Sequence, residues 1–60
     1  PKVVKKENQF LKPMSVEEAA MQMDVADKNF LVFTDSITSN INVIYRIEDG
    51  DYGLIETTVK

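Results

Sequence analysis

Three neighbouring segments of this chain are rich in β-branched and aromatic residues, which predicts three consecutive strands at 30–34, 41–47 and 52–56. Each segment carries apolar side chains at both odd and even positions. Successive side chains point to opposite faces of a strand, so a sheet with one wet face shows apolar and polar residues in turn. These strands do not show that alternation. We therefore expect one sheet face to pack on the chain's own helix and the other on a partner.

The length of 60 residues predicts a single domain over 1–60. A domain of this size buries only roughly 60% of the surface that its unfolded chain exposes, so its stability is marginal unless oligomerisation contributes. The sequence has no Cys and no His, which leaves no disulfide, no thiol catalysis and few ways to hold a transition metal. The lack of Cys fits a reducing compartment, and we expect a cytoplasmic protein. Because the chain begins at Pro1 without an initiator Met, we expect it to be part of a longer protein.

The charge and the motifs speak against several function classes. The net charge of −3 and the absence of clustered Lys and Arg argue against direct nucleic-acid binding. No apolar run approaches the ~20 residues of a membrane span. There is no nucleophile beside a base, no Gly-rich phosphate loop and no recognisable carboxylate pair, so we expect no enzyme activity and no cofactor. The acidic residues around Gly50 lack the ligand spacing of a calcium loop, and the three Met residues are expected to be packing residues.

The first half of the chain predicts one strand and one helix. Residues 2–10 are interpreted as a first strand, which Pro13 ends because it lacks a backbone donor. Ser15 and Glu18 have the spacing of a capping box, and the apolar stripe that follows predicts a helix over Val16–Ala26. Asp27 or Asn29 is expected to end the helix in the left-handed conformation.

The dipeptide Asp49-Gly50 predicts a two-residue hairpin turn of type I′. That turn would pair Ile47 with Tyr52 and Tyr45 with Leu54. If Thr34 also opposes Ile41, one sheet face is strongly apolar and the other holds Ile44, Arg46, Gly53 and Ile55 together with Leu31 and Phe33. The fold class is then α+β, a single β-α-β-β-β domain with a mostly antiparallel sheet and one helix on one face. A homodimer is expected to cover the apolar face, with interface residues Phe30, Val32, Val43, Tyr45, Ile47, Tyr52 and Leu54.

The same residues resemble a known family. The ordered set Phe10-Leu-Lys-Pro-Met14, Glu17-Glu-Ala19, Phe30-Leu-Val-Phe-Thr34, Tyr45-Arg46 and Asp49-Gly-Asp-Tyr-Gly-Leu-Ile55 is similar to the C-terminal domain of the long-form ribosome hibernation promoting factors, also called ribosome-associated inhibitor or sigma-54 modulation proteins. The resemblance implies a domain that forms homodimers and so joins two ribosomes into a silent pair. It also implies a separate N-terminal domain, outside this chain, that binds the small (30S) ribosomal subunit.

The sequence departs from that family at three positions. Asp27 and Ser39 stand where turn glycines are common in the family, which residues in the left-handed region can absorb at modest cost. Ile47 stands where a second basic residue often follows Tyr-Arg. Two other functions remain open at this point: a small-ligand regulatory domain, for which Asn42 and Arg46 are the candidate polar groups, and a domain that docks a different protein.

Overall fold

The computed structural model describes residues 1–6 and 12–58. Its elements follow the expected β-α-β-β-β order of an α+β domain, with one short 3₁₀-helix added between the last two strands. They are β1 (Pro13–Met14), α1 (Val16–Ala26), β2 (Phe30–Asp35), β3 (Ile41–Arg46), η1 (Glu48–Gly50) and β4 (Tyr52–Glu56).

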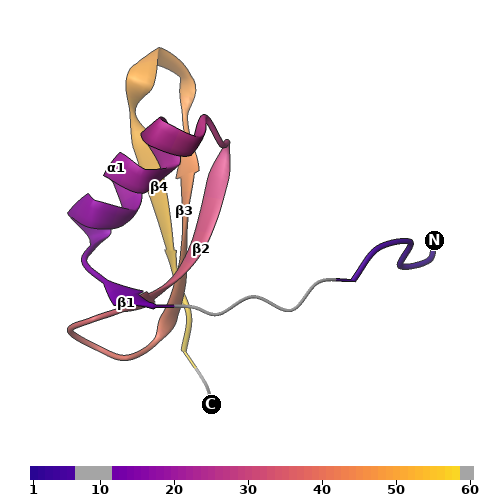
Figure 1. The fold of residues 1–60 in the computed structure, drawn as a ribbon, viewed down its shortest axis with the longest axis horizontal. Coiled ribbons are helices and arrows are strands. Elements are labelled where there is room, and N and C mark those ends of the chain that lie inside the picture. The colour runs from indigo at the N-terminus through magenta and orange to yellow at the C-terminus, as the bar shows by residue number, and fades with distance from the viewer. Residues whose placement is uncertain (7–11, 59–60) are drawn as a thin grey trace.

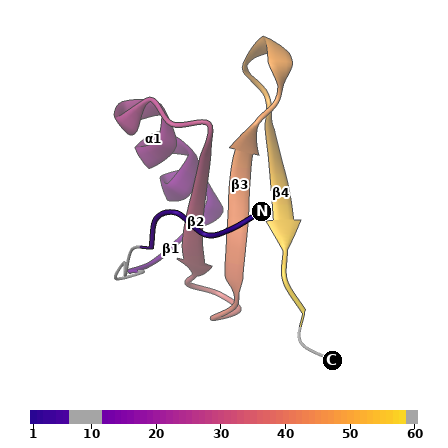
Figure 2. The ribbon, with the colours of Figure 1, turned by 90° about the vertical axis from the view of Figure 1, so that its right-hand side faces the viewer.

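The four strands form one sheet in the order β1-β2-β3-β4. β1 runs parallel to β2, whereas β2, β3 and β4 are antiparallel to their neighbours. α1 lies on one face of this sheet, and the other face of the three long strands is left open (Figure 1). Figure 2 looks onto that open side, with β2, β3 and β4 side by side and α1 at the left, partly behind β2. No helix in the part of the chain that the structure describes is long and apolar enough to cross a membrane.

Local signals account for the helix, whose bounds agree with the prediction. The Ser15 side chain accepts a hydrogen bond of 3.1 Å from the backbone N–H of Glu18, as expected for a helix cap. Glu17 and Glu18 lie in the first turn, where the helix dipole favours negative charge. At the other end Asp27 adopts φ 52° and closes the helix, and Ser39 has φ 64° in the β2–β3 turn. Both departures from turn glycines are thus absorbed by left-handed residues.

The predicted first strand over residues 2–10 is wrong for 2–6, which form no strand, while residues 7–10 lie outside the described residues. The first strand is instead Pro13–Met14, which pairs with Thr34 and Asp35. The Met14 carbonyl accepts from the Ser36 N–H at 3.0 Å, and Pro13 is tolerated because this strand lies at the sheet edge. The parallel pairing joins segments about twenty residues apart, so local alternation did not reveal it.

The core lies between α1 and the sheet. Its fully buried apolar side chains are Ala19 and Met23 from α1, Phe33 from β2 and Ile44 from β3. Met14, Val16, Ala20 and Leu31 pack around them. This cluster is small, in keeping with the limited burial expected for a short domain.

The β2–β3 register is the one predicted. Thr34 opposes Ile41, so Val32 opposes Val43 and Phe30 opposes Tyr45. These residues face away from α1, while Leu31 and Phe33 pack beneath the helix.

The predicted β3–β4 hairpin is wrong by one residue. Arg46 opposes Tyr52, Tyr45 opposes Gly53 and Ile44 opposes Leu54. The loop is longer than a two-residue turn because η1 forms within it, and the N–H of Ile47 donates to the Asp51 carbonyl at 2.8 Å. A shift of one residue moves every side chain of a strand to the opposite face. Tyr52 and Leu54 therefore lie on the helix side, and Gly53 and Ile55 lie on the open side.

Candidate functional site

The surface that stands out is the sheet face turned away from α1. We call it the open face. Its apolar members come from all three long strands: Phe30, Val32, Ile41, Val43, Tyr45 and Ile55. The register arranges them in rows across the strands, so that Phe30, Tyr45 and Gly53 form one row and Val32, Val43 and Ile55 form the next.

The open face is uncovered by the described residues. Phe30 keeps 60% of its surface exposed, Ile55 52% and Ile41 48%, whereas Phe33, the neighbour of Val32 on the helix side, is fully buried. Val32 and Val43 are half-buried by the side chains beside them. A contiguous apolar sheet face with this exposure is typical of an interaction surface in a soluble domain.

The structure brings together four of the seven residues predicted for this face: Phe30, Val32, Val43 and Tyr45. Tyr52 and Leu54 belong to the helix side, and Ile47 lies in the β3–β4 loop. Two apolar residues of the open face, Ile41 and Ile55, were not predicted from the sequence. Ile41 has the same parity as Val43 and could have been found from it, whereas Ile55 depends on the loop length.

A polar cluster joins the helix side of the sheet to the end of α1. Arg46 on β3 lies 3.3 Å from Asp24 and 3.5 Å from Asp27, and the Tyr52 hydroxyl donates to the same Asp24 carboxylate. This hydrogen bond is the main cause of a raised pKa for Tyr52, with further contributions from desolvation and the Asp24 charge, while Arg46 opposes the shift. Through Asp24 the cluster ties β3 and β4 to the helix, in addition to the packing of α1 on β2 and β3.

The raised pKa of Tyr52 predicts a loss of stability at alkaline pH. A group whose pKa is raised by folding stabilises the fold fully below its usual pKa, here 10.0, and that contribution is lost as the pH rises through the raised value. As the pH rises from 10.0 through the raised pKa, we expect the free energy of unfolding of the wild type to fall more steeply than that of Tyr52→Phe. Urea titrations at matched protein concentration measure this difference. Parallel curves for the two proteins would contradict this role of the hydroxyl.

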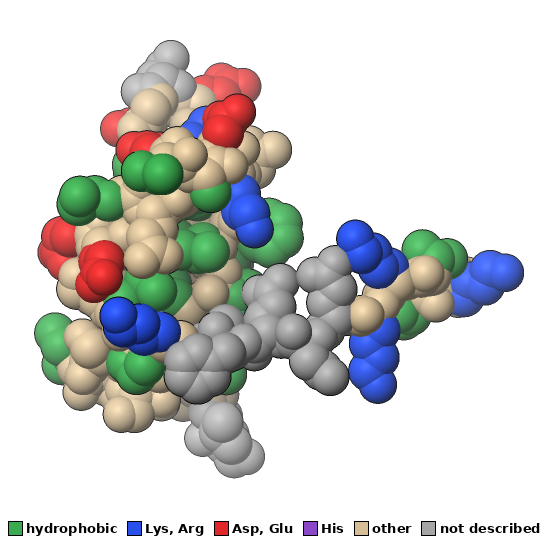
Figure 3. All heavy atoms as spheres, viewed as in Figure 1, with side chains coloured by type: hydrophobic (Ala, Val, Ile, Leu, Met, Phe, Trp, Pro, Cys, Tyr) green, Lys and Arg blue, Asp and Glu red, His purple; other side chains and the backbone are tan. Residues whose placement is uncertain are grey.

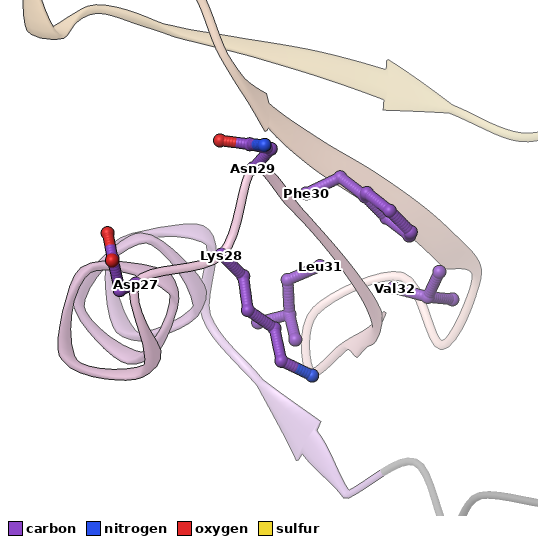
Figure 4. Close-up of a pocket in the computed structure, with 6 residues that line it drawn as sticks. All are labelled: Asp27, Lys28, Asn29, Phe30, Leu31 and Val32. Atoms are coloured by element: carbon purple, nitrogen blue, oxygen red, sulfur yellow. The ribbon is translucent and has the colours of Figure 1, made fainter.

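The two polar residues considered for a small ligand do not converge on a cavity. Asn42 is buried beneath α1, where its side-chain amide donates to Asp35 at 3.4 Å, and Arg46 is engaged with Asp24 and Asp27. A hollow of about 450 Å³ lies at the turn between α1 and β2, lined by 27–32. Figure 4 shows that Phe30 and Val32 point to one side of β2 and Leu31 to the other, so the residues that line the hollow lie on both faces of the strand. Within the described ranges, no cluster of three acidic side chains could hold a metal ion.

The charge distribution sets the open face apart from the rest of the surface. In Figure 3 acidic side chains lie over the helix and the hairpin end of the domain, while a group of basic side chains lies on the N-terminal segment. The open-face positions of β2 and β3 carry no charged residue; they are Phe30, Val32, Thr34, Ile41, Val43 and Tyr45. This surface therefore favours apolar contact over ionic contact.

Residues 1–54 match the family model described as Sigma 54 modulation/S30EA ribosomal protein C terminus. The chain belongs to this family. Among similar proteins, a ribosome hibernation promotion factor of Bacillus subtilis (strain 168) is 50% identical over 56 residues, which cover 93% of this chain. A protein of the same name from Lactococcus lactis subsp. cremoris (strain MG1363) is 49% identical over 55 residues, or 92% of the chain. The match spans 30% of the length of each relative.

This match confirms the resemblance to the Sigma 54 modulation/S30EA C-terminal family that the residue pattern indicated. It covers the helix and all strands up to Leu54, and so includes most of the open face.

Proposed function

We propose that this chain is a homodimerisation module whose open face stacks on the open face of a second copy. The uncovered apolar face is the observation that supports this proposal. Its members Phe30, Ile41 and Ile55 remain about half exposed to water. Two sheets that pack face to face lie about 10 Å apart and bury their inner side chains between them. A two-fold axis lets one self-complementary surface serve both partners.

The small core supports the same proposal. Among the residues that the structure describes, four apolar side chains are fully buried, which is few for a domain that must offset the conformational entropy of its chain. A dimer would bury the open face as a second core, and burial of apolar surface stabilises by roughly 25 cal/mol for each Å². Folding and association are then coupled, so the apparent stability rises with protein concentration.

The names of the relatives suggest the setting in which the dimer works. Both are ribosome hibernation promotion factors, and each is about three times as long as the matched region. We infer that this chain, joined to a ribosome-binding domain in a longer protein, links two ribosome-bound copies and so pairs two ribosomes in an inactive state. The acidic chain itself is not expected to bind RNA.

Sedimentation of the 60-residue chain tests the dimer directly. We expect a species of about twice 6.8 kDa at micromolar concentration, with an interface of at least roughly 1,200 Å² in total. Because the contact is apolar, its dissociation constant should change little between low and moderate salt. A monomer that persists at about 100 µM would contradict the proposal, since such weak association is unlike a specific interface. A steep dependence on salt would place the contact on the charged surface instead.

A further inference from the structure

Gly53 lies on the open face directly opposite Tyr45. What distinguishes this position is the crowded space around it and not its backbone conformation. Gly50 needs glycine because its φ is 80°, whereas Gly53 has no positive φ. A methyl group at Gly53 would lie 2.7 Å from Tyr45 Cε1 and closer still to Cζ. Carbon atoms in contact are normally about 3.5 Å apart or more. The tip of the Tyr45 ring therefore occupies the space that a side chain at position 53 would fill.

The consequence is a lowered aromatic ring on the middle strand of the open face, in the row nearest the β3–β4 loop. Tyr45 lies between Phe30 and Gly53 in one cross-strand row, and it retains 37% exposure where Phe30 retains 60%. The ring leans over β4 instead of standing away from the sheet. If the space over Gly53 were filled, the ring would have to leave its position over β4. A ring displaced outward from this row would hold two stacked sheets apart.

We propose that Gly53 is a positioning residue for self-association: it lets the Tyr45 ring lie across β4, which keeps the open face level enough to stack on a second copy. This inference rests on the proposed function and names the residue that shapes its surface. It predicts that one substitution moves folding and association in opposite directions. Ala forms strands better than Gly, and only the movable end of a side chain stands in its way, so Gly53→Ala folds at least as well as the wild type.

The test compares Gly53→Ala with the wild type by sedimentation equilibrium and by thermal unfolding at low concentration. We expect the dissociation constant of the dimer to rise about tenfold or more, as for overpacking at a close-fitting contact, while the midpoint of unfolding of the monomer does not fall. A variant that dimerises like the wild type overturns the inference. So does a variant whose monomer is destabilised, because Gly53 then serves the fold and not the face.

A double-mutant cycle links the effect to the ring. In a Tyr45→Ala background, adding Gly53→Ala should change the dissociation constant by less than about twofold, because the obstructing ring is gone. An equal loss in both backgrounds would show that Gly53 acts without Tyr45, against the inference.

The placement of the ring has its own readout, which does not depend on association. In the wild type we expect the Gly53 α-protons to be shifted upfield by the ring current of Tyr45 in proton NMR spectra, and the shift to disappear in Tyr45→Ala. Ordinary strand values for these protons in the wild type would overturn the positioning itself. A wild type that stays monomeric contradicts the proposed function and the second copy as partner, so the two failures are distinguishable.

Discussion

Val32→Asp is expected to give a folded monomer. Val32 lies on the open face, so in a symmetric dimer the substitution buries an unpaired carboxylate twice, which costs several kcal/mol. In the monomer the same carboxylate faces water and is tolerated. Sedimentation gives the oligomeric state, and far-ultraviolet circular dichroism reports whether the fold is kept.

Two matched variants sharpen this prediction. Phe33→Asp, one residue further along β2, places the charge in the fully buried core and is expected to unfold the chain. Val25→Asp makes the same chemical change as Val32→Asp on the outer side of α1, where Val25 is 89% exposed, and should leave the dimer intact. An unfolded Val32→Asp would assign position 32 to the intramolecular core. A dimeric Val32→Asp would place the interface elsewhere on the surface.

The second large effect is expected in a longer protein that carries this chain together with a ribosome-binding domain. There Tyr45→Asp should still bind single ribosomes but should not produce paired ribosomes on a sucrose gradient. In the proposed mechanism one domain holds the ribosome, and the dimer raises the effective concentration of one bound copy near the other. Without the dimer the two particles are independent, so the paired species falls to background.

The controls for this experiment separate tethering from ribosome binding. The same protein with Val25→Asp should pair ribosomes like the wild type, because Val25 lies on α1, away from the open face. The 60-residue chain alone should not co-sediment with ribosomes at physiological salt, since it has a net charge of −3. Normal pairing by Tyr45→Asp, or tight ribosome binding by the chain alone, would contradict the tether mechanism.

The helix and the content of the long strands could be predicted because their signals are local. Ser15, the acidic first turn and Asp27 mark the two ends of α1 within a few residues of chain, and their hydrogen bonds form between neighbours. The apolar composition of β2, β3 and β4 likewise reports burial on a sheet. Alternation along β3 then places Tyr45 and Val43 on one face once Thr34 is paired with Ile41.

The sequence by itself determined that this chain has one capped helix, three long strands and more apolar sheet surface than the helix can cover. Only the tertiary structure decided which side of β4 faces outward, because the five-residue connection 47–51 fixes the register and a change of one residue reverses the strand. The contacts that accompany this register are distant in sequence: Arg46 and Tyr52 meet Asp24, and Tyr45 lies over Gly53. The first strand was likewise decided by parallel pairing across α1, at Pro13–Met14. Such pairings depend on segments that meet only after the chain has folded, so no local pattern encodes them.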